Sequence, residues 1–189
     1  MASTIETAIR SVVGKGIEKV ADYNRSRMRD DGPNIFLTGI HTPMTSEETI
    51  ADLRVEGSIP ASLDGRYLRI GPNPVTPPNP AAYHWFTGDG MAHGVRVQGG
   101  KALWYRNRWI RSNAVSDALG EPRAPGQRSQ LSANANTNIV GIAGRTWAIV
   151  EAGGNPVELS DGLDTVAHNP FDGTLDVPFS AHPHHCPLT

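Results

Sequence analysis

The stretch Gly94–Arg111, GVRVQGGKALWYRNRWIR, carries the clearest structural signal in the sequence. Its central Gly99-Gly100 pair is a two-residue turn signal, and apolar residues occur at every second position on both sides of it. This pattern predicts a β-hairpin, because every second side chain of a strand lies on the same face. The apolar residues that share one face of the predicted hairpin are Val95, Val97, Ala102 and Trp104.

A second hairpin is predicted from residues 138–142 and 146–151, joined through Ala143-Gly144-Arg145. This arrangement places Glu151 at the end of a strand, next to the turn signal Gly153-Gly154. We expect residues 112–132, between the two hairpins, to form a loop.

Chain-breaking residues favour short strands over long helices, since the 189 residues include 20 glycines and 15 prolines. Residues 71–80 are especially rich in proline, and we expect an extended connector there because proline cannot donate to a strand ladder. Hairpins that recur roughly every 40 residues are typical of propeller blades. The chain has room for about two or three blades, fewer than the four that close a ring, so the sequence predicts an all-β, incomplete β-propeller.

A helix is predicted in residues 1–30, ahead of the β-rich residues 31–189. Ser3 and Glu6 have the spacing of a capping box, and apolar residues recur near a helical period. The remaining positions carry several lysines and arginines, which is one pattern of a helix that lies on a membrane surface. Glu18, Asp22 and two interrupting glycines weaken that interpretation in favour of an ordinary surface helix.

Charge and cysteine content restrict the function further. A formal net charge of -2 offers no basic field for nucleic acid, so we expect no nucleic-acid partner. The single cysteine, Cys186, excludes an internal disulfide and favours a reducing, cytoplasmic location. No apolar run near the N-terminus is long enough for a signal peptide or a membrane span. The sequence also lacks a nucleophile elbow, a phosphate-binding loop and a dinucleotide fingerprint.

Histidines are the main candidates for chemistry. His182 and His184 lie with His185 beside Cys186, and such a cluster is one way to hold zinc or copper. His84 and His93 flank a glycine-rich segment, where an imidazole more often bonds to backbone groups than to a metal. The isolated His41 and His168 are expected to be structural.

Several motifs, taken in order, closely resemble those of the carotenoid oxygenase family. The two longest are LDGRYLRIGPNP at residues 63–74 and YHWFTGDGMAHG at residues 83–94. Shorter matches follow at Tyr105–Arg108, Ala135–Thr137, Leu163–Thr165 and Ser180–Pro183, and the resemblance runs from about Pro33 to Thr189.

The resemblance implies a seven-bladed β-propeller with one Fe(II) held on its axis by four histidines. It places the first iron ligand at His182, in the Ala181-His182-Pro183 motif, and a carboxylate that bonds to a ligand histidine at Glu151. The expected reaction joins O2 to a C=C double bond of a carotenoid, apocarotenoid or other apolar polyene and yields two carbonyl products. Val150 stands where stilbene-cleaving members are expected to have a lysine, which favours an apolar substrate.

The chain also departs from the family pattern. His184 and Cys186 replace the basic and acidic residues usual after the Ala-His-Pro motif, and the pattern continues beyond Thr189. We therefore expect an N-terminal piece of the enzyme, lacking three of the four iron ligands and inactive by itself. The alternatives are a stilbene-cleaving dioxygenase, a non-catalytic propeller-like binding module and a decayed gene product.

Overall fold

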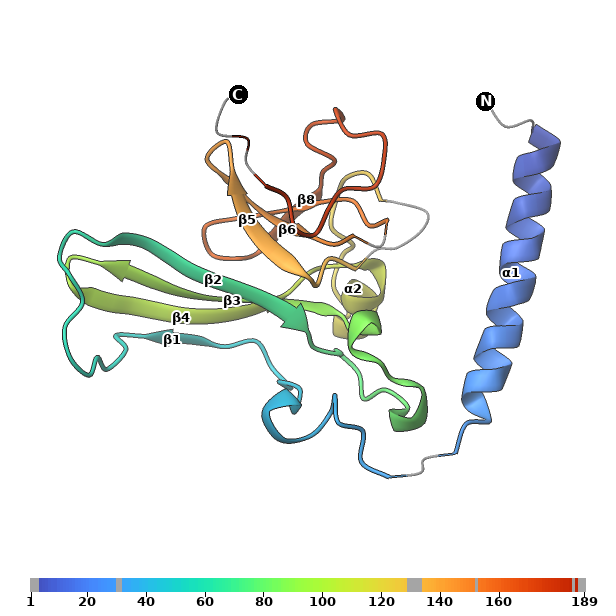
Figure 1. Ribbon diagram of the computed structural model, residues 1–189, viewed down its shortest axis with the longest axis horizontal. Coiled ribbons are helices and arrows are strands. Elements are labelled where there is room, and N and C mark those ends of the chain that lie inside the picture. The colour runs from blue at the N-terminus through green and yellow to red at the C-terminus, as the bar shows by residue number, and fades with distance from the viewer. Residues whose placement is uncertain (1–3, 30–31, 129–133, 152, 185, 187–189) are drawn as a thin grey trace. The chain divides into compact units, whose positions relative to one another are not determined.

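The computed structural model describes residues 4–29, 32–128, 134–151, 153–184 and 186. The chain forms two compact units, one of residues 1–42 with 78–83 and the other of residues 43–77 with 84–189. The second unit holds all the strands of the described residues (Figure 1). The boundary predicted between residues 30 and 31 falls on undescribed positions and stays a prediction.

The first unit contains the predicted N-terminal helix, α1 (Thr4–Ser26), and two short helices, η1 (Gly39–His41) and η2 (Pro80–Ala82). The Asn34 side-chain amide donates to the carbonyls of Pro80, at 2.7 Å, and Tyr83, at 2.8 Å. These bonds join two segments that are distant in sequence. None of the described helices is long and apolar enough to cross a membrane.

The first sheet has the order β1-β4-β3-β2 and is antiparallel throughout (Figure 1). Its strands are β1 (Thr49–Ala51), β2 (Asp64–Pro72), β3 (Gly90–Gln98) and β4 (Lys101–Trp109). A short helix, η3 (Trp85–Thr87), precedes β3. The strand β2 takes in Gly71 and Pro72, so the proline-rich connector is shorter than predicted. A proline fits there because β2 lies at an edge of the sheet.

The hairpin predicted around Gly99-Gly100 is β3–β4. Val97 lies opposite Ala102 as expected, but a bulge shifts the register so that Trp104 lies opposite Arg96 instead of Val95. The prediction that Trp104 shares a face with Val95 and Val97 was therefore wrong. A bulge adds one residue to one strand, which no count of alternating positions reveals.

The second sheet has the order β5-β6-β7-β8 and is also antiparallel. Its strands are β5 (Asn138–Ile142), β6 (Arg145–Ile149), β7 (Val157–Leu159) and β8 (Thr165–His168). The second predicted hairpin is β5–β6, with a two-residue turn at Ala143 and Gly144, both at positive φ. Such a turn matches the twist of the strands it joins, so Arg145 belongs to β6 and not to the turn.

A short helix, α2 (Asn113–Leu119), lies in the segment predicted as a loop. The Ser112 hydroxyl caps it by accepting a hydrogen bond from the Val115 amide at 3.2 Å, and Gly120 ends it at φ 67°. Val115 is buried, so packing adds to the local caps. Helical periodicity does not reveal a helix that spans only seven residues.

The core of the second unit lies between the two sheets. Apolar residues from both sheets and from the loops beside them form one buried cluster, namely Ala92, Ile110, Ala135, Ala148, Val157, Leu159 and Leu163. Arg66 of β2 adds a polar link by donating to the Thr146 hydroxyl of β6 at 2.8 Å. The two four-stranded sheets agree with the two to three blades expected from the sequence.

Candidate metal-binding segment

The end of the β5–β6 hairpin holds the segment that contains His182. Asn138 opens β5 and lies opposite Ile149, the last residue of β6. Its side-chain amide donates to the carbonyl of Ala181 at 2.9 Å. Ala181 is buried, while His182 is exposed. The backbone before His182 is thus fastened to the hairpin, at the end opposite the Ala143-Gly144 turn.

Glu151 lies at the same end of the hairpin, two residues beyond Ile149. It follows the strand instead of ending it, and it is exposed next to the buried Val150. Neither the His182 ring nor the Glu151 carboxylate forms a hydrogen bond or ion pair with any residue that the structure describes. Both side chains can therefore bind other groups without first losing a protein contact.

Of the described residues after His182, His184 and Cys186 are exposed and Pro183 is half-buried. His185, in the same C-terminal tail, lies outside the described residues. The described part of the chain contains no group of three or more histidines, cysteines or carboxylates arranged to hold a metal. The zinc or copper site in this tail stays a prediction.

His84 has the structural role expected from its glycine-rich surroundings. Its Nδ1 accepts a hydrogen bond from the Phe86 amide at 3.3 Å and so caps the helix η3. His168 is buried in β8, and its Nε2 lies 2.9 Å from the Arg111 carbonyl oxygen. Burial lowers the pKa of His168, although its bond to Arg111 opposes this. Both imidazoles thus bond to the backbone.

His93 is held in the first sheet by a tyrosine. Its Nδ1 lies 2.9 Å from the Tyr105 hydroxyl, on the neighbouring strand β4. Burial, together with the positive charge of Arg69, lowers the pKa of His93 to about 4. The ring is therefore neutral at pH 7 and hydrogen-bonded within the protein, but its partner is a side-chain hydroxyl and not the backbone group that was predicted.

Sequence reasoning missed the role of Asn138, which it treated only as the first residue of a strand. A side chain that bonds across 43 residues of sequence leaves no mark in local periodicity. An asparagine at the start of an apolar strand was the one available signal, because its amide needs a hydrogen-bond partner when partly buried.

A family model described as retinal pigment epithelial membrane protein matches residues 41–189. A carotenoid cleavage oxygenase of Mycobacterium tuberculosis is 52% identical over 162 residues, which are 84% of this chain and 32% of the relative. The chain belongs to the carotenoid oxygenase family. Another member, lignostilbene-alpha,beta-dioxygenase isozyme III of Sphingomonas paucimobilis, is 33% identical over 81% of this chain and 34% of its own length. The chain thus spans about a third of these relatives.

Solved structures of family members share the fold. Lignostilbene dioxygenase from Pseudomonas brassicacearum aligns with a TM-score of 0.66 and 26% identity, over 81% of this chain and 34% of the other. A cobalt-substituted apocarotenoid oxygenase of Synechocystis aligns with a TM-score of 0.61 and 28% identity, over 75% and 33% of the two chains. These neighbours are β-propellers, so the predicted fold class is confirmed and the two sheets correspond to propeller blades.

Proposed function

We propose that this chain is part of an Fe(II)-dependent dioxygenase that cleaves a C=C double bond of a carotenoid, apocarotenoid or related polyene into two carbonyl products. The observation that carries the proposal is the placement of the segments that lead to His182 and to Glu151 at the same end of the β5–β6 hairpin. Family membership supports the oxygenase class, and the substrate and the metal are our inference.

His182 is the residue that would hold the iron. Its imidazole is exposed, has no competing partner among the described residues, and follows a backbone position fixed by Asn138. An imidazole nitrogen is a suitable donor for Fe(II), but one donor cannot hold it. Three further histidines would come from polypeptide outside residues 1–189, and the isolated chain is expected to lack activity. When bound, Fe(II) would supply the site where O2 and the alkene react.

Glu151 would act as a hydrogen-bond acceptor for one of the ligand histidines. A carboxylate that accepts the ring N–H determines which nitrogen of the imidazole faces outward and makes the ring a stronger donor. Its negative charge also offsets the positive charge of a metal held only by neutral imidazoles. Its exposed position leaves the carboxylate available for this bond.

Val150 favours an apolar polyene over a phenolic stilbene. The side chain immediately before Glu151 is apolar and buried, and it provides no group that can bond to a phenol oxygen. The carotenoid cleavage oxygenase is also more similar to this chain than the lignostilbene enzyme, at 52% against 33% identity. A stilbene-cleaving dioxygenase is the second candidate, because both kinds of enzyme are relatives.

The genome gives the first test. DNA downstream of the Thr189 codon should encode further histidine-bearing blades, and their absence in every frame would leave only a decayed product or a non-catalytic module.

The second test is enzymatic. Protein that contains those blades is incubated with O2 and either a polyene aldehyde or a hydroxystilbene, and products are identified by mass spectrometry. We expect two carbonyl products from the polyene; cleavage of the stilbene alone would favour the second candidate.

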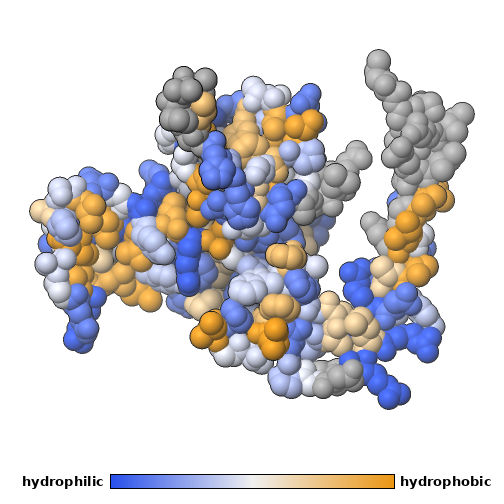
Figure 2. Space-filling model, in the orientation of Figure 1, coloured by the Kyte–Doolittle hydropathy of each residue, from blue (hydrophilic) through white to orange (hydrophobic). Residues whose placement is uncertain are grey.

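We also propose that α1 contacts the surface of a membrane from the cytoplasmic side. Apolar side chains gather along its described part (Figure 2), and those of Val12, Val13, Ile17, Val20 and Tyr23 are all exposed. Exposed lysines and arginines lie along the same helix, and their positive charge can bind the anionic headgroups of a membrane. The protein should sediment with anionic vesicles, and deletion of residues 1–26 should abolish this. Equal sedimentation after the deletion would contradict the proposal.

A further inference from the structure

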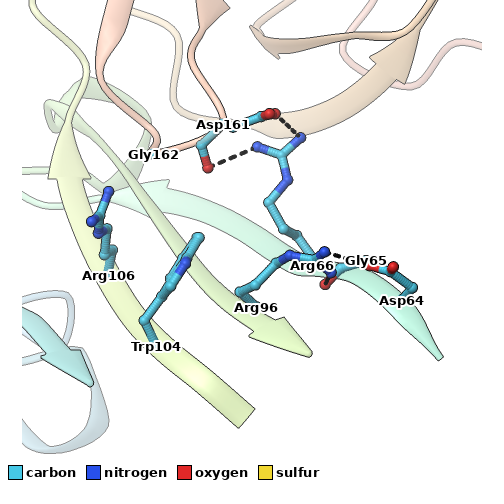
Figure 3. Close-up of a pocket in the computed structure, with 8 residues that line it drawn as sticks. All are labelled: Asp64, Gly65, Arg66, Arg96, Trp104, Arg106, Asp161 and Gly162. Carbon is cyan, nitrogen blue, oxygen red and sulfur yellow. Dashed lines mark hydrogen bonds and ion pairs between the residues drawn. The ribbon is translucent and has the colours of Figure 1, made fainter. Parts of the chain in front are cut away.

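A cavity of about 460 Å³ lies between the first sheet and the turn that joins β7 to β8, and His182 is not among its lining residues (Figure 3). Three strands of the first sheet, β2, β3 and β4, each direct an arginine toward it. Its principal lining residues are Arg66, Arg96, Trp104, Arg106, Asp161 and Gly162. The proposed iron chemistry uses none of these residues.

Two of these arginines, Arg66 and Arg96, lie so close together that they need negative charge nearby. Arg66 lies directly opposite Arg96, and like charges in that position destabilise a sheet. Each guanidinium has a carboxylate partner within the protein. Arg66 forms an ion pair of 3.1 Å with Asp161, and Arg96 forms one with Asp64. These two charges are therefore matched before any ligand binds.

Arg106 has no such partner. No carboxylate lies within ion-pair distance of it in the part of the chain that the structure describes, and no described residue accepts its hydrogen bonds. Its Nε is buried without a hydrogen-bond partner. The guanidinium lies over the Trp104 ring, 5.1 Å from the ring centroid. Arg106 thus brings an unmatched positive charge to a cavity that also contains an aromatic face.

Gly162, in the β7–β8 turn, lies close to this guanidinium. A Cβ on Gly162 would lie 2.5 Å from Nη1 of Arg106, too close for any other residue without a shift. The glycine therefore leaves room for the arginine, while Asp161 next to it pairs with Arg66. Figure 3 shows Gly162 and Asp161 on the side of the cavity that faces the arginines.

We propose that this cavity binds a small organic monocarboxylate. The three guanidinium groups and the two carboxylates of the lining leave one positive charge, which a single carboxylate neutralises. A planar guanidinium matches the two oxygens of a carboxylate. The apolar part of the ligand packs beside Trp104. This site is independent of the proposed iron-dependent reaction and is testable without iron or turnover.

The test measures thermal stability and tryptophan fluorescence of the purified protein in sodium benzoate, acetate, phosphate or chloride at constant ionic strength. Benzoate should raise the melting temperature saturably, with half-saturation near about 1 mM, and acetate should bind more weakly because it lacks an apolar ring. Arg106→Gln should weaken benzoate binding about tenfold or more. Arg145→Gln is the matched control, because Arg145 also lies over a tryptophan, Trp147, but pairs with Asp172 outside this cavity.

The Arg106→Lys variant supplies a second test if Arg106→Gln does not fold. It keeps the charge but loses the planar pair of donors, so benzoate should bind several-fold more weakly than to the wild type. Four results would overturn the proposal. They are no saturable response in the wild type, stabilisation by phosphate alone, equal benzoate binding after Arg106→Gln, and unchanged binding after Arg106→Lys.

Discussion

The Asn138 side chain and the Ala181 carbonyl meet at 2.9 Å, although 43 residues of sequence separate them. Asn138 also pairs with Ile149 through the backbone, so one residue holds both the strand that leads to Glu151 and the segment that leads to His182. Neither candidate residue needs a direct contact with the other to be placed at the same end of the hairpin. The geometry of the proposed iron ligand therefore depends on an amide that takes no part in the chemistry.

Replacing Asn138 with alanine should release the His182 segment. In protein that contains all four ligands, we expect iron affinity to fall about tenfold, as for other residues that orient ligands, and stability to fall by about 1 kcal/mol. Asn155→Ala is the control, because the Asn155 amide donates to the Gln127 carbonyl at 2.7 Å and not to the segment that leads to His182. Iron titration checks this, and equal iron affinity in both variants would contradict the role of Asn138.

Glycine is required at position 90, at the start of β3. A Cβ there would lie 2.1 Å from the Ala135 carbonyl oxygen, a backbone atom that cannot move aside cheaply. We expect Gly90→Ala to lower the free energy of unfolding by about 3 kcal/mol, measured by urea denaturation. Gly141→Ala, in β5, meets open space and should change stability little. If Gly90→Ala left the free energy of unfolding unchanged, β3 and the loop that contains Ala135 could not approach each other this closely.

His93 should make the fold sensitive to mild acid. Its pKa in the folded protein is lowered to about 4, from an ordinary value of 6.5. The unfolded chain therefore takes up the proton first, and stability should fall as the pH drops from about 6.5 to about 4. In His93→Gln this dependence should be smaller, but it should persist in part because the pKa of His168 is lowered too. Urea denaturation between pH 4.5 and 7.5 compares the two proteins, and identical pH profiles would count against a buried neutral His93.

Arg111 holds together two carboxylates from distant segments. It forms ion pairs with Glu47 at 2.5 Å and with Glu121 at 2.7 Å, and these bonds raise its pKa although burial opposes them. We expect Arg111→Gln to cost about 2 kcal/mol of stability, because the partly buried Glu47 then keeps only the longer ion pair with Arg108, at 4.0 Å. The control is Arg123→Gln, whose partner Asp117 is exposed and which should have no measurable effect. Similar denaturation midpoints for both variants would refute this difference.

Much of the fold could be predicted from the sequence, since turn dipeptides and alternating apolar residues are local signals. The Gly99-Gly100 and Ala143-Gly144 turns led directly to β3–β4 and β5–β6, and the apolar period of the first residues led to α1. The bulge beside Arg96 and the short helix after Ser112 did not follow, because they depend on packing and on single capping bonds.

The candidate site was predictable only in part. Local patterns drew attention to His182, in a histidine-rich segment, and to Glu151, near a strand end, but the roles of both came from the family resemblance. The bond from Asn138, and the charges gathered around Arg106, join segments far apart in the chain. Such contacts arise from the register of the sheets and the path of the loops, which a single sequence does not contain.

The most direct test of the account measures bound iron and O2 consumption with a polyene aldehyde. It uses residues 1–189 alone, protein extended by the downstream blades, and the extended protein with His182→Ala. We predict about one iron per chain and turnover in the extended protein, and neither in the other two. Stoichiometric iron in the short chain, or full iron and turnover after His182→Ala, would contradict the assignment of His182 as one of four ligands.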